Sequence, residues 1–571
     1  MNTNLKTMKR ILTALAATTT IAMSAVTTPV LYEGGSFKCF SPNGNYAIQD
    51  PGDQSPMVIM DLVNNQDYPY MEEYGSGHGN CISDNGVVVG YSISKERAAY
   101  WQNGVWKELN VGATTALSYA NGITPDGKII VGSISPLTYA GDYEGIMLVP
   151  VYWQLNGNGV YEGPKNLPYP TVEFTNRKPQ YVTAIRISED GKTIAGQMKD
   201  YLGMVCQPVI YTCDDSGTWS YELLVEELFH PEGYELPEYP GDGPVQQDFM
   251  TPEEIKAYDE AVENWNNSVY DAPYPEIDSY MTEEEKAAFV EAASIWLERY
   301  TNFEDALWRL LAVVPNFEYN NVYMTTDGKQ YATTDTKYFI DEARELQYRE
   351  CAPYLIDIES DTYKKFPGEG EVQVMLSGLA DDGTLIGQVN DDIYGLFNGY
   401  ICPAGKENFI PIYDFIEKVD KATAEWMKEN MTHTYDKYDF ETGEIVPTTI
   451  TATGIPFCTP DMSLIGFAQY SFWNYTNEYQ YYGYLISLPP YAGVEELSDV
   501  ADDFSIKILP GGTLDIEGTV SSLQIYSLNG LKVYAAENIT GILNTNLSKG
   551  IYVIKADGGK GNVYNKKIVI R

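Results

Sequence analysis

The residues that could carry acid–base or metal chemistry are few and far apart in the sequence. The three histidines are His78, His230 and His433, and none has the H-E-x-x-H or H-x-x-x-H spacing that brings two imidazoles together on a helix. The cysteines also lack the C-x-x-C spacing typical of zinc ligands. We therefore predict no metal ligand and no cofactor-binding residue.

Two pairs of neighbouring acids, Asp381 with Asp382 and Asp391 with Asp392, have the chemistry of calcium sites or glycosidases. With 80 acidic residues, however, adjacent acids are expected by chance, and no D-x-D-x-D-G loop is present. The glycine-rich residues 75–79 lead into a predicted strand rather than the helix that a phosphate loop requires. No G-x-S-x-G elbow or Walker loop occurs. The sequence therefore assigns no catalytic residue.

The seven cysteines cannot all pair with one another, because their number is odd. Cys206 and Cys213 flank a short segment and could form a disulfide in an oxidising compartment. The others are Cys39, Cys81, Cys351, Cys402 and Cys458. Their spacing indicates no further pairing.

The chain is strongly acidic, with a formal net charge of -43. Phosphate backbones and anionic lipid surfaces would be repelled at long range, so we exclude nucleic acid as a partner. The charge is uneven: residues 505–571 carry eight basic and four acidic side chains, a net of +4. The C-terminal segment is therefore predicted to be a separate domain.

The first 25 residues have the pattern of a signal peptide. A basic start is followed by an apolar run over residues 11–25, which ends in small residues suited to cleavage near residue 24 or 25. No later window approaches the roughly 18 apolar residues of a membrane-spanning helix. We expect an exported protein, extracellular or on the outer cell surface, with no integral membrane segment.

A short turn pattern recurs along the chain, usually Ser or Thr followed two residues later by Asn or Asp and then by Gly. Asn-Gly and Asp-Gly favour tight hairpins, and we expect type I′ turns. In five copies an apolar run follows the turn and ends at a second glycine. The seven copies begin at Ser41, Ser83, Thr124, Ser188, Thr325, Ala380 and Thr459.

A second, aromatic hairpin follows three of these copies, around Trp101, Trp153 and Tyr211. Two hairpins make a four-stranded unit, and the first copies follow one another at 42 and 41 residues, the period of a propeller blade. With 47 Tyr, 49 Gly and few charges, the composition favours short strands. We predict an all-β propeller of about seven four-stranded blades, closed by residues 30–37. A linear β-solenoid is the alternative.

Long insertions separate the later copies, and two capping-box starts predict helices there. Thr251-Pro-Glu-Glu254 and Thr282-Glu-Glu-Glu285 each precede an apolar stripe, and a third helix is expected over residues 303–311. These helices form a predicted subdomain over about 245–313. Residues 415–426 predict one further helix. Insertions on a rigid scaffold are where function often lies.

Each repeat consists of a turn, an apolar run that ends at a glycine, and an aromatic strand pair. This repeat resembles the HAF repeats of secreted bacterial propeller-like proteins, most clearly over residues 81–109 and 121–153. The C-terminal runs IYSLNGLKVY, LSKGIYVIKA and KKIVIR resemble the type IX secretion (Por) sorting domain. This second resemblance implies a small β-sandwich and export through type IX-like machinery.

The predicted organisation is a signal peptide over 1–25, a propeller over 26–490, a linker over 491–503 and a sorting-type domain over 504–571. We expect a non-catalytic binding protein that presents a propeller face and the helical insertion to an extracellular glycan or protein. The alternative is a propeller glycoside hydrolase or lyase that acts on extracellular polysaccharide through acids facing the central channel.

Overall fold

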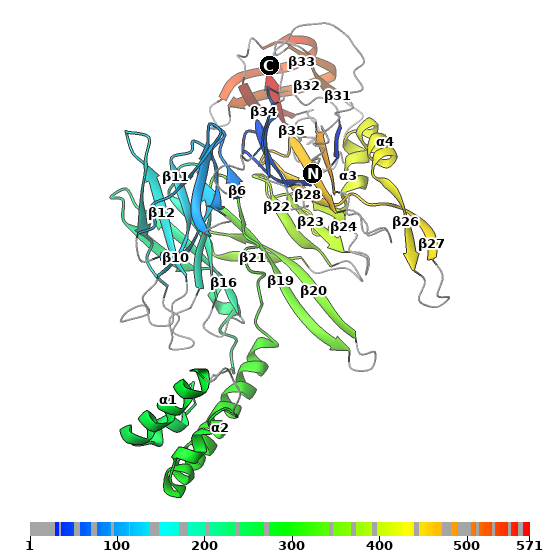
Figure 1. The fold of residues 1–571 in the computed structure, drawn as a ribbon. Coiled ribbons are helices and arrows are strands. Elements are labelled where there is room, and N and C mark those ends of the chain that lie inside the picture. Colours follow the sequence, from blue (N-terminus) through cyan, green and yellow to red (C-terminus); the bar gives the residue numbers. More distant parts are fainter. Residues whose placement is uncertain are drawn as a thin grey trace, which may run out of the picture.

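The computed structural model describes residues 29–488 and 504–570 apart from internal gaps, the longest of which are 137–147, 171–180 and 471–480. The predicted signal peptide lies outside the described residues. Seven four-stranded antiparallel sheets make up the body of the chain (Figure 1). We call them blades 1 to 7.

The blades follow the chain in order, each built from consecutive strands except the last. Blades 1 to 3 consist of β2 (Ser36–Phe40), β3 (Tyr46–Asp50), β4 (Val58–Asp61) and β5 (Gln66–Pro69); β6 (Gly77–Ile82), β7 (Val88–Ser92), β8 (Arg97–Gln102) and β9 (Val105–Glu108); and β10 (Thr115–Ile123), β11 (Ile129–Pro136), β12 (Val149–Leu155) and β13 (Tyr161–Asn166).

Blades 4 to 7 consist of β14 (Tyr181–Ile187), β15 (Thr193–Lys199), β16 (Cys206–Cys213) and β17 (Trp219–Leu223); β18 (Tyr323–Met324), β19 (Gln330–Asp341), β20 (Leu346–Asp357) and β21 (Thr362–Lys365); β22 (Met375–Leu379), β23 (Leu385–Asn390), β24 (Phe397–Cys402) and β25 (Ile410–Pro411); and β28 (Ile455–Cys458), β29 (Leu464–Tyr470), β30 (Tyr481–Ser487) and β1 (Val30–Glu33).

The sheets form a closed ring. The first strand of each blade contacts the first strand of the next, from β2 through β6, β10, β14, β18 and β22 to β28, which contacts β2 again. The ring is also tied by the chain start, because β1 pairs with β30 from Val30 opposite Leu485 to Glu33 opposite Tyr482. The fold is a β-propeller, and closure by the N-terminal segment is confirmed for residues 30–33.

Each repeated turn connects the first two strands of a blade. The fourth residue donates its N–H to the carbonyl of the first and has a positive φ, at six glycines and at Met462. The residue before it does not have a positive φ, so the turns are type I turns followed by a left-handed residue. The type I′ prediction was wrong, although the glycine requirement was correct.

The first residue of the turn explains why Ser or Thr recurs there. In blade 2 the buried Ser83 hydroxyl lies 2.5 Å from Asn85 Oδ1 and accepts the N–H of Val87 at 3.0 Å. Equivalent bonds form in every blade except blade 6, where Ala380 replaces the hydroxyl. The side chain therefore completes the turn by satisfying backbone groups.

We expect Ser83→Ala to lower the free energy of unfolding by about 1–3 kcal/mol, because a buried N–H loses its side-chain acceptor. Chemical denaturation measures this loss. Ser216→Ala is the matched control, since the Ser216 hydroxyl also bonds to a side chain of its own turn, that of Asp214, but is exposed. Equal effects of the two substitutions would contradict the role assigned to the buried hydroxyl.

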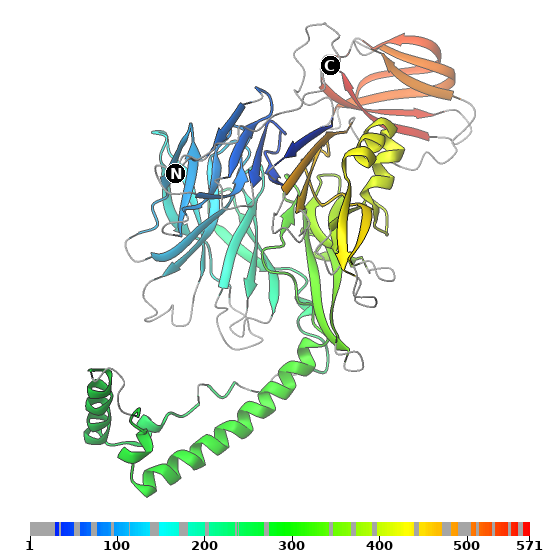
Figure 2. The same ribbon diagram turned by 45° about the vertical axis from the view of Figure 1, so that its right-hand side comes forward.

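The long connection between β17 and β18 carries the helical subdomain, which extends away from the propeller (Figure 2). It contains η3 (Glu226–Leu228), η4 (Gln246–Phe249), α1 (Pro252–Asn267), η5 (Ile277–Tyr280) and α2 (Glu283–Leu311). Both predicted capping boxes form, at Thr251 with Glu254 and at Thr282 with Glu285. The predicted third helix is wrong, because residues 303–311 continue α2 without a break.

A second insertion follows β25 and contains α3 (Ile412–Val419), α4 (Lys421–Asn430) and the hairpin β26 (Thr432–Tyr438) and β27 (Ile445–Thr451). The sequence predicts a single helix here. The helix is instead interrupted at Asp420, where the backbone is extended. The Asp420 carboxylate caps α4 by accepting the N–H groups of Ala422 and Thr423. Both helices pack on the core shared by blades 6 and 7.

The C-terminal domain is a five-stranded antiparallel sheet of β31 (Phe504–Leu509), β32 (Thr513–Ser527), β33 (Lys532–Asn544), β34 (Gly550–Asp557) and β35 (Val563–Ile570). The long strand β32 has a register shift around Gly518, so that its first half pairs with β31 and its second half with β34. The domain has its own hydrophobic core, drawn from residues 514–556. Among the described helices, none is long and apolar enough to cross a membrane.

Candidate functional site

The first strands of the blades surround a space at the centre of the ring. It holds two cavities of about 550 and 950 Å³. Lys38, His78, Asn80 and Arg186 line both cavities, so the two adjoin, and we call them together the central channel. The smaller cavity opens toward the repeated turns, because Pro42, Pro125 and Pro460 line it.

In five blades the first strand has a β-bulge, and each bulge inserts one extra residue at an equivalent position of the strand. The register shifts fall between Phe37 and Cys39, and at the equivalent positions of blades 2, 3, 4 and 6. A bulge turns a side chain away from its usual direction and is common near binding sites. The bulged residues, which all line the channel, are Lys38, Asn80, Asn121, Ile185 and Ser377.

Three of these bulged side chains join neighbouring blades. The Asn80 amide donates to the carbonyl of Ala120 at 3.0 Å, and the Asn121 amide donates to that of Ala184 at 2.9 Å. The Ser377 hydroxyl donates to the carbonyl of Pro456 at 2.5 Å. The channel wall is therefore held by side-chain bonds between blades, which makes it a preformed site.

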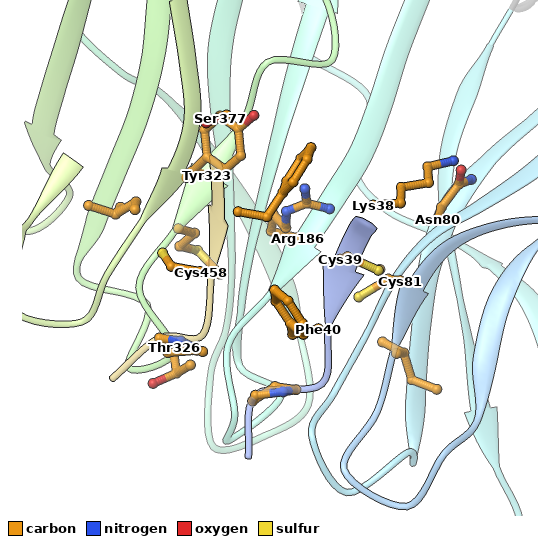
Figure 3. A pocket seen from close by; sticks show the side chains of 18 of the residues that line it. Lys38, Cys39, Phe40, Asn80, Cys81, Arg186, Tyr323, Thr326, Ser377 and Cys458 are labelled. Carbon is orange, nitrogen blue, oxygen red and sulfur yellow. The ribbon is translucent and has the colours of Figure 1, made fainter. Parts of the chain in front are cut away.

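Cationic side chains gather in the channel. Lys38 Nζ lies 2.8 Å from His78 Nε2, and the Arg186 guanidinium lies 5.9 Å from the centre of the Tyr323 ring (Figure 3). Lys199 Nζ lies 5.5 Å from the centre of the Tyr319 ring. Cations over aromatic faces are attracted by the ring quadrupole.

Tyrosines line the larger cavity, on the side away from the repeated turns. Tyr91 and Tyr119 make an edge contact at 5.3 Å, and Tyr91 lies 5.3 Å from the His78 ring. Tyr181 and Tyr319 line the same cavity. Burial raises the pKa of Tyr319 to about 12 and raises the pKa of Tyr91 and Tyr119 as well. The phenols of Tyr319, Tyr91 and Tyr119 are thus neutral hydrogen-bonding groups at physiological pH.

Two cysteines of neighbouring blades, Cys39 and Cys81, also line the smaller cavity, and their side chains face each other (Figure 3). Burial, reinforced by Cys81, raises the pKa of Cys39 to about 12. At neutral pH this thiol stays protonated, and a thiol is a poor nucleophile. Cys39 is therefore not suited to nucleophilic catalysis.

These raised pKa values predict that the protein loses stability in alkali. Burial raises the pKa of Cys39 and Tyr323 to about 12, and that of Cys402 to about 11. In the unfolded chain the pKa of cysteine is about 8.5 and that of tyrosine about 10. Between about pH 8.5 and 12 the unfolded state releases protons that the folded state retains, so the free energy of unfolding falls as pH rises. Melting curves should keep one Tm from pH 6.5 to 7.5 and show a falling Tm above about pH 8.5; a constant Tm up to pH 11 would contradict these assignments.

The possible disulfide between Cys206 and Cys213 is not formed. Both residues lie on the extended strand β16, at its two ends, and both are free thiols. Seven residues of strand span about 23 Å, whereas the Cα atoms of a disulfide lie within about 7 Å of each other.

The C-terminal domain matches a family model that bears on export of the chain. Residues 501–571 match the family model of the secretion system C-terminal sorting domain. The chain ends in a type IX secretion sorting domain. A chain with this sorting domain is exported to the cell surface or the extracellular space. No curated protein matches the sequence.

This sorting-domain protein also aligns with several solved structures. TolB from Acinetobacter baumannii aligns over 66% of this chain and 64% of its own, at 11% identity and a TM-score of 0.28. One of two prolyl endopeptidases aligns over 92% and 55%, at 10% identity and a TM-score of 0.36. The tricorn protease aligns over 96% and 47%, at 11% identity and a TM-score of 0.30. The chain thus spans about half to two thirds of their lengths, and the propeller assignment rests on the strand topology described above.

The residues singled out in the sequence lie in different places. His78 is part of β6 and lines the channel, whereas its spacing in the sequence indicated no role for it. His230 lies 3.5 Å from Glu226, far from the other histidines in sequence, and His433 is on β26. Among the described residues, no group of three His, Cys, Asp or Glu side chains could hold a metal ion.

The two acidic pairs have different outcomes. Asp381 accepts the N–H and hydroxyl of Thr326, each at 2.7 Å, and so joins the turns of blades 5 and 6. Asp382 accepts the N–H of Thr384 within its own turn. Asp391 and Asp392 lie outside the described residues. The carboxylates of the first pair are thus used in holding the turns.

Proposed function

We propose that the exported protein is a non-catalytic glycan-binding protein, with the central channel as its site. The observation that carries this proposal is the arrangement of tyrosine rings around a recessed channel that also holds cationic and amide groups. Tyrosine offers a flat apolar face for a sugar ring and a hydroxyl for hydrogen bonding. A recessed pocket with a few convergent polar groups is typical of small-ligand sites.

Binding is favoured over glycoside hydrolysis by the scarcity of acids in the channel. Hydrolysis of a glycosidic bond uses two carboxyl groups that flank it. Glu189 is the single acid among the described residues that line the channel, and it is exposed near the repeated turns. A single carboxylate does not provide the acid and base of a hydrolase.

The helical subdomain favours a second candidate function, binding of a protein. Val290, Leu297 and Trp308 lie on one face of α2 and are 63%, 57% and 56% exposed. Exposed apolar side chains that share a helix face are typical of protein interfaces. In the same exported protein, this surface would serve a partner other than the glycan.

A glycan array probed with the full exported chain tests the proposal. We expect retention of a defined set of glycans, and about tenfold weaker binding by Tyr119→Ala, equivalent to ~1.4 kcal/mol. The matched control is Tyr234→Ala, because Tyr234 is exposed and lies outside the channel lining. Retention of no glycan, or equal losses in both variants, would overturn the proposal, and release of shorter saccharides would favour the hydrolase alternative.

A further inference from the structure

The charge of the central channel is opposite to that of the whole chain. Acidic residues outnumber basic ones by 80 to 37 in the sequence. Among the described residues lining the channel, Glu189 is the single acid, whereas Lys38, Arg186 and Lys199 are basic. A local reversal of this kind in an acidic protein indicates a site for a negatively charged group.

Arg186 is the central member of this group. It lies on β14, directly after the bulge at Ile185, and is half-buried. Within the described part of the chain, its guanidinium makes no ion pair and no hydrogen bond, and its contact is the face of Tyr323. Partial desolvation of an unpaired guanidinium costs free energy, which a bound anion would offset.

Arg186 lies between two walls of the channel. In Figure 3 it lies between Tyr323 on one side and Lys38 with Cys39 on the other. Its charge counteracts the effect of burial on the pKa of both Tyr323 and Cys39, which belong to blades 5 and 1. The guanidinium, supplied by blade 4, therefore affects both opposite walls.

We propose that the ligand is an acidic glycan and that the carboxylate of a uronic acid residue binds Arg186, in a channel whose other basic side chains are Lys38 and Lys199. This inference rests on the proposed glycan-binding function. The planar guanidinium matches a carboxylate through two parallel hydrogen bonds, and the tyrosines receive the sugar rings.

The net charge of the protein limits the kind of acidic glycan. A long polyuronate would bring many negative charges to a chain of net charge -43 and would be repelled at long range. A glycan with one acidic residue meets the cationic channel at a small cost in repulsion. We therefore expect a single terminal or widely spaced uronate rather than a polyuronate.

Calorimetric titration of the full exported chain tests this inference, with a glucuronate-terminated trisaccharide and its glucose-terminated counterpart as probes. We expect the acidic probe to bind at least tenfold more tightly. Arg186→Gln should remove this preference, because it should weaken binding of the acidic probe at least tenfold more than binding of the neutral probe, and Arg186→Lys should keep part of it. The control is Lys192→Gln, since Lys192 is exposed and already paired with Asp215 at 2.8 Å.

The outcomes separate this inference from the proposed function. Equal affinity for the two probes overturns the uronate inference and leaves glycan binding in place. An equal loss of both probes in Arg186→Gln, with an unchanged Tm, also overturns it, because it assigns Arg186 a role unrelated to charge. Binding of neither probe, together with an array that retains no glycan, overturns the proposed function and the inference with it.

Discussion

Gly90→Ala is expected to destabilise the propeller by about 3 kcal/mol, the upper part of the range for overpacking. A Cβ atom at Gly90 would lie 1.7 Å from the carbonyl oxygen of His78, a backbone atom of the neighbouring strand. The strands β6 and β7 would have to separate at the bulge that carries Asn80. Urea denaturation measures the loss of stability, and glycan binding by the folded fraction should fall as well.

Gly157→Ala is the matched control for this prediction. Gly157 has an ordinary φ, and a Cβ atom there would meet no heavy atom within 4 Å. We expect a change of less than about 0.5 kcal/mol for this surface substitution. Equal stability of the Gly90 and Gly157 variants would show that the strand opposite the bulge tolerates a side chain, contrary to the geometry.

Deletion of residues 501–571 is expected to keep the protein from reaching the cell surface or the medium. The sorting domain has a separate hydrophobic core within residues 514–556, and the other core clusters contain no residue beyond 488. The propeller should therefore fold without it, and the truncated chain should be retained in the cells. Immunoblots of cell fractions and medium measure the distribution.

The melting temperature of the truncated chain provides the control for this experiment. An unchanged propeller transition shows that the defect concerns export rather than folding. Appearance of the folded, truncated chain in the medium at the level of the full chain would contradict the role assigned to the sorting domain.

The repeats made the scaffold predictable from the sequence. The turn glycines mark positions of positive φ, and the run that follows each turn becomes the second strand of a blade. The turn type was mispredicted because an Asp-Gly pair suits both a type I′ turn and a type I turn with a left-handed residue after it. The choice between the two turns depends on the hydroxyl of Ser or Thr. It accepts a backbone N–H after the left-handed residue and so stabilises the longer, type I form.

The helices show where local signals are insufficient. Capping boxes identified the starts of α1 and α2, because the cap bonds are made within four residues. The break at Asp420 was missed, since the apolar spacing continues through it while the aspartate forms a new cap. The continuity of α2 was missed for the opposite reason. A separate helix was predicted over residues 303–311, but no cap interrupts the chain at residues 301–303.

The residues that line the channel were not predicted, because they come from different blades and have no common spacing. One signal was present: Gly90, Gly132, Gly196 and Gly387 each lie opposite a bulge in the first strand. The second glycine of the repeat thus marks the level of the channel-lining residues. Their chemistry, by contrast, depends on which side chain occupies the bulge in each blade.

A crystal structure of the full chain with the glycan selected on the array is the most direct measurement of where the ligand binds. We expect sugar rings against Tyr91 and Tyr119 and an acidic group within hydrogen-bonding distance of Arg186. Glycan density on the helical subdomain or on the outer strands, with an empty channel, would contradict the assignment of the central channel as the binding site.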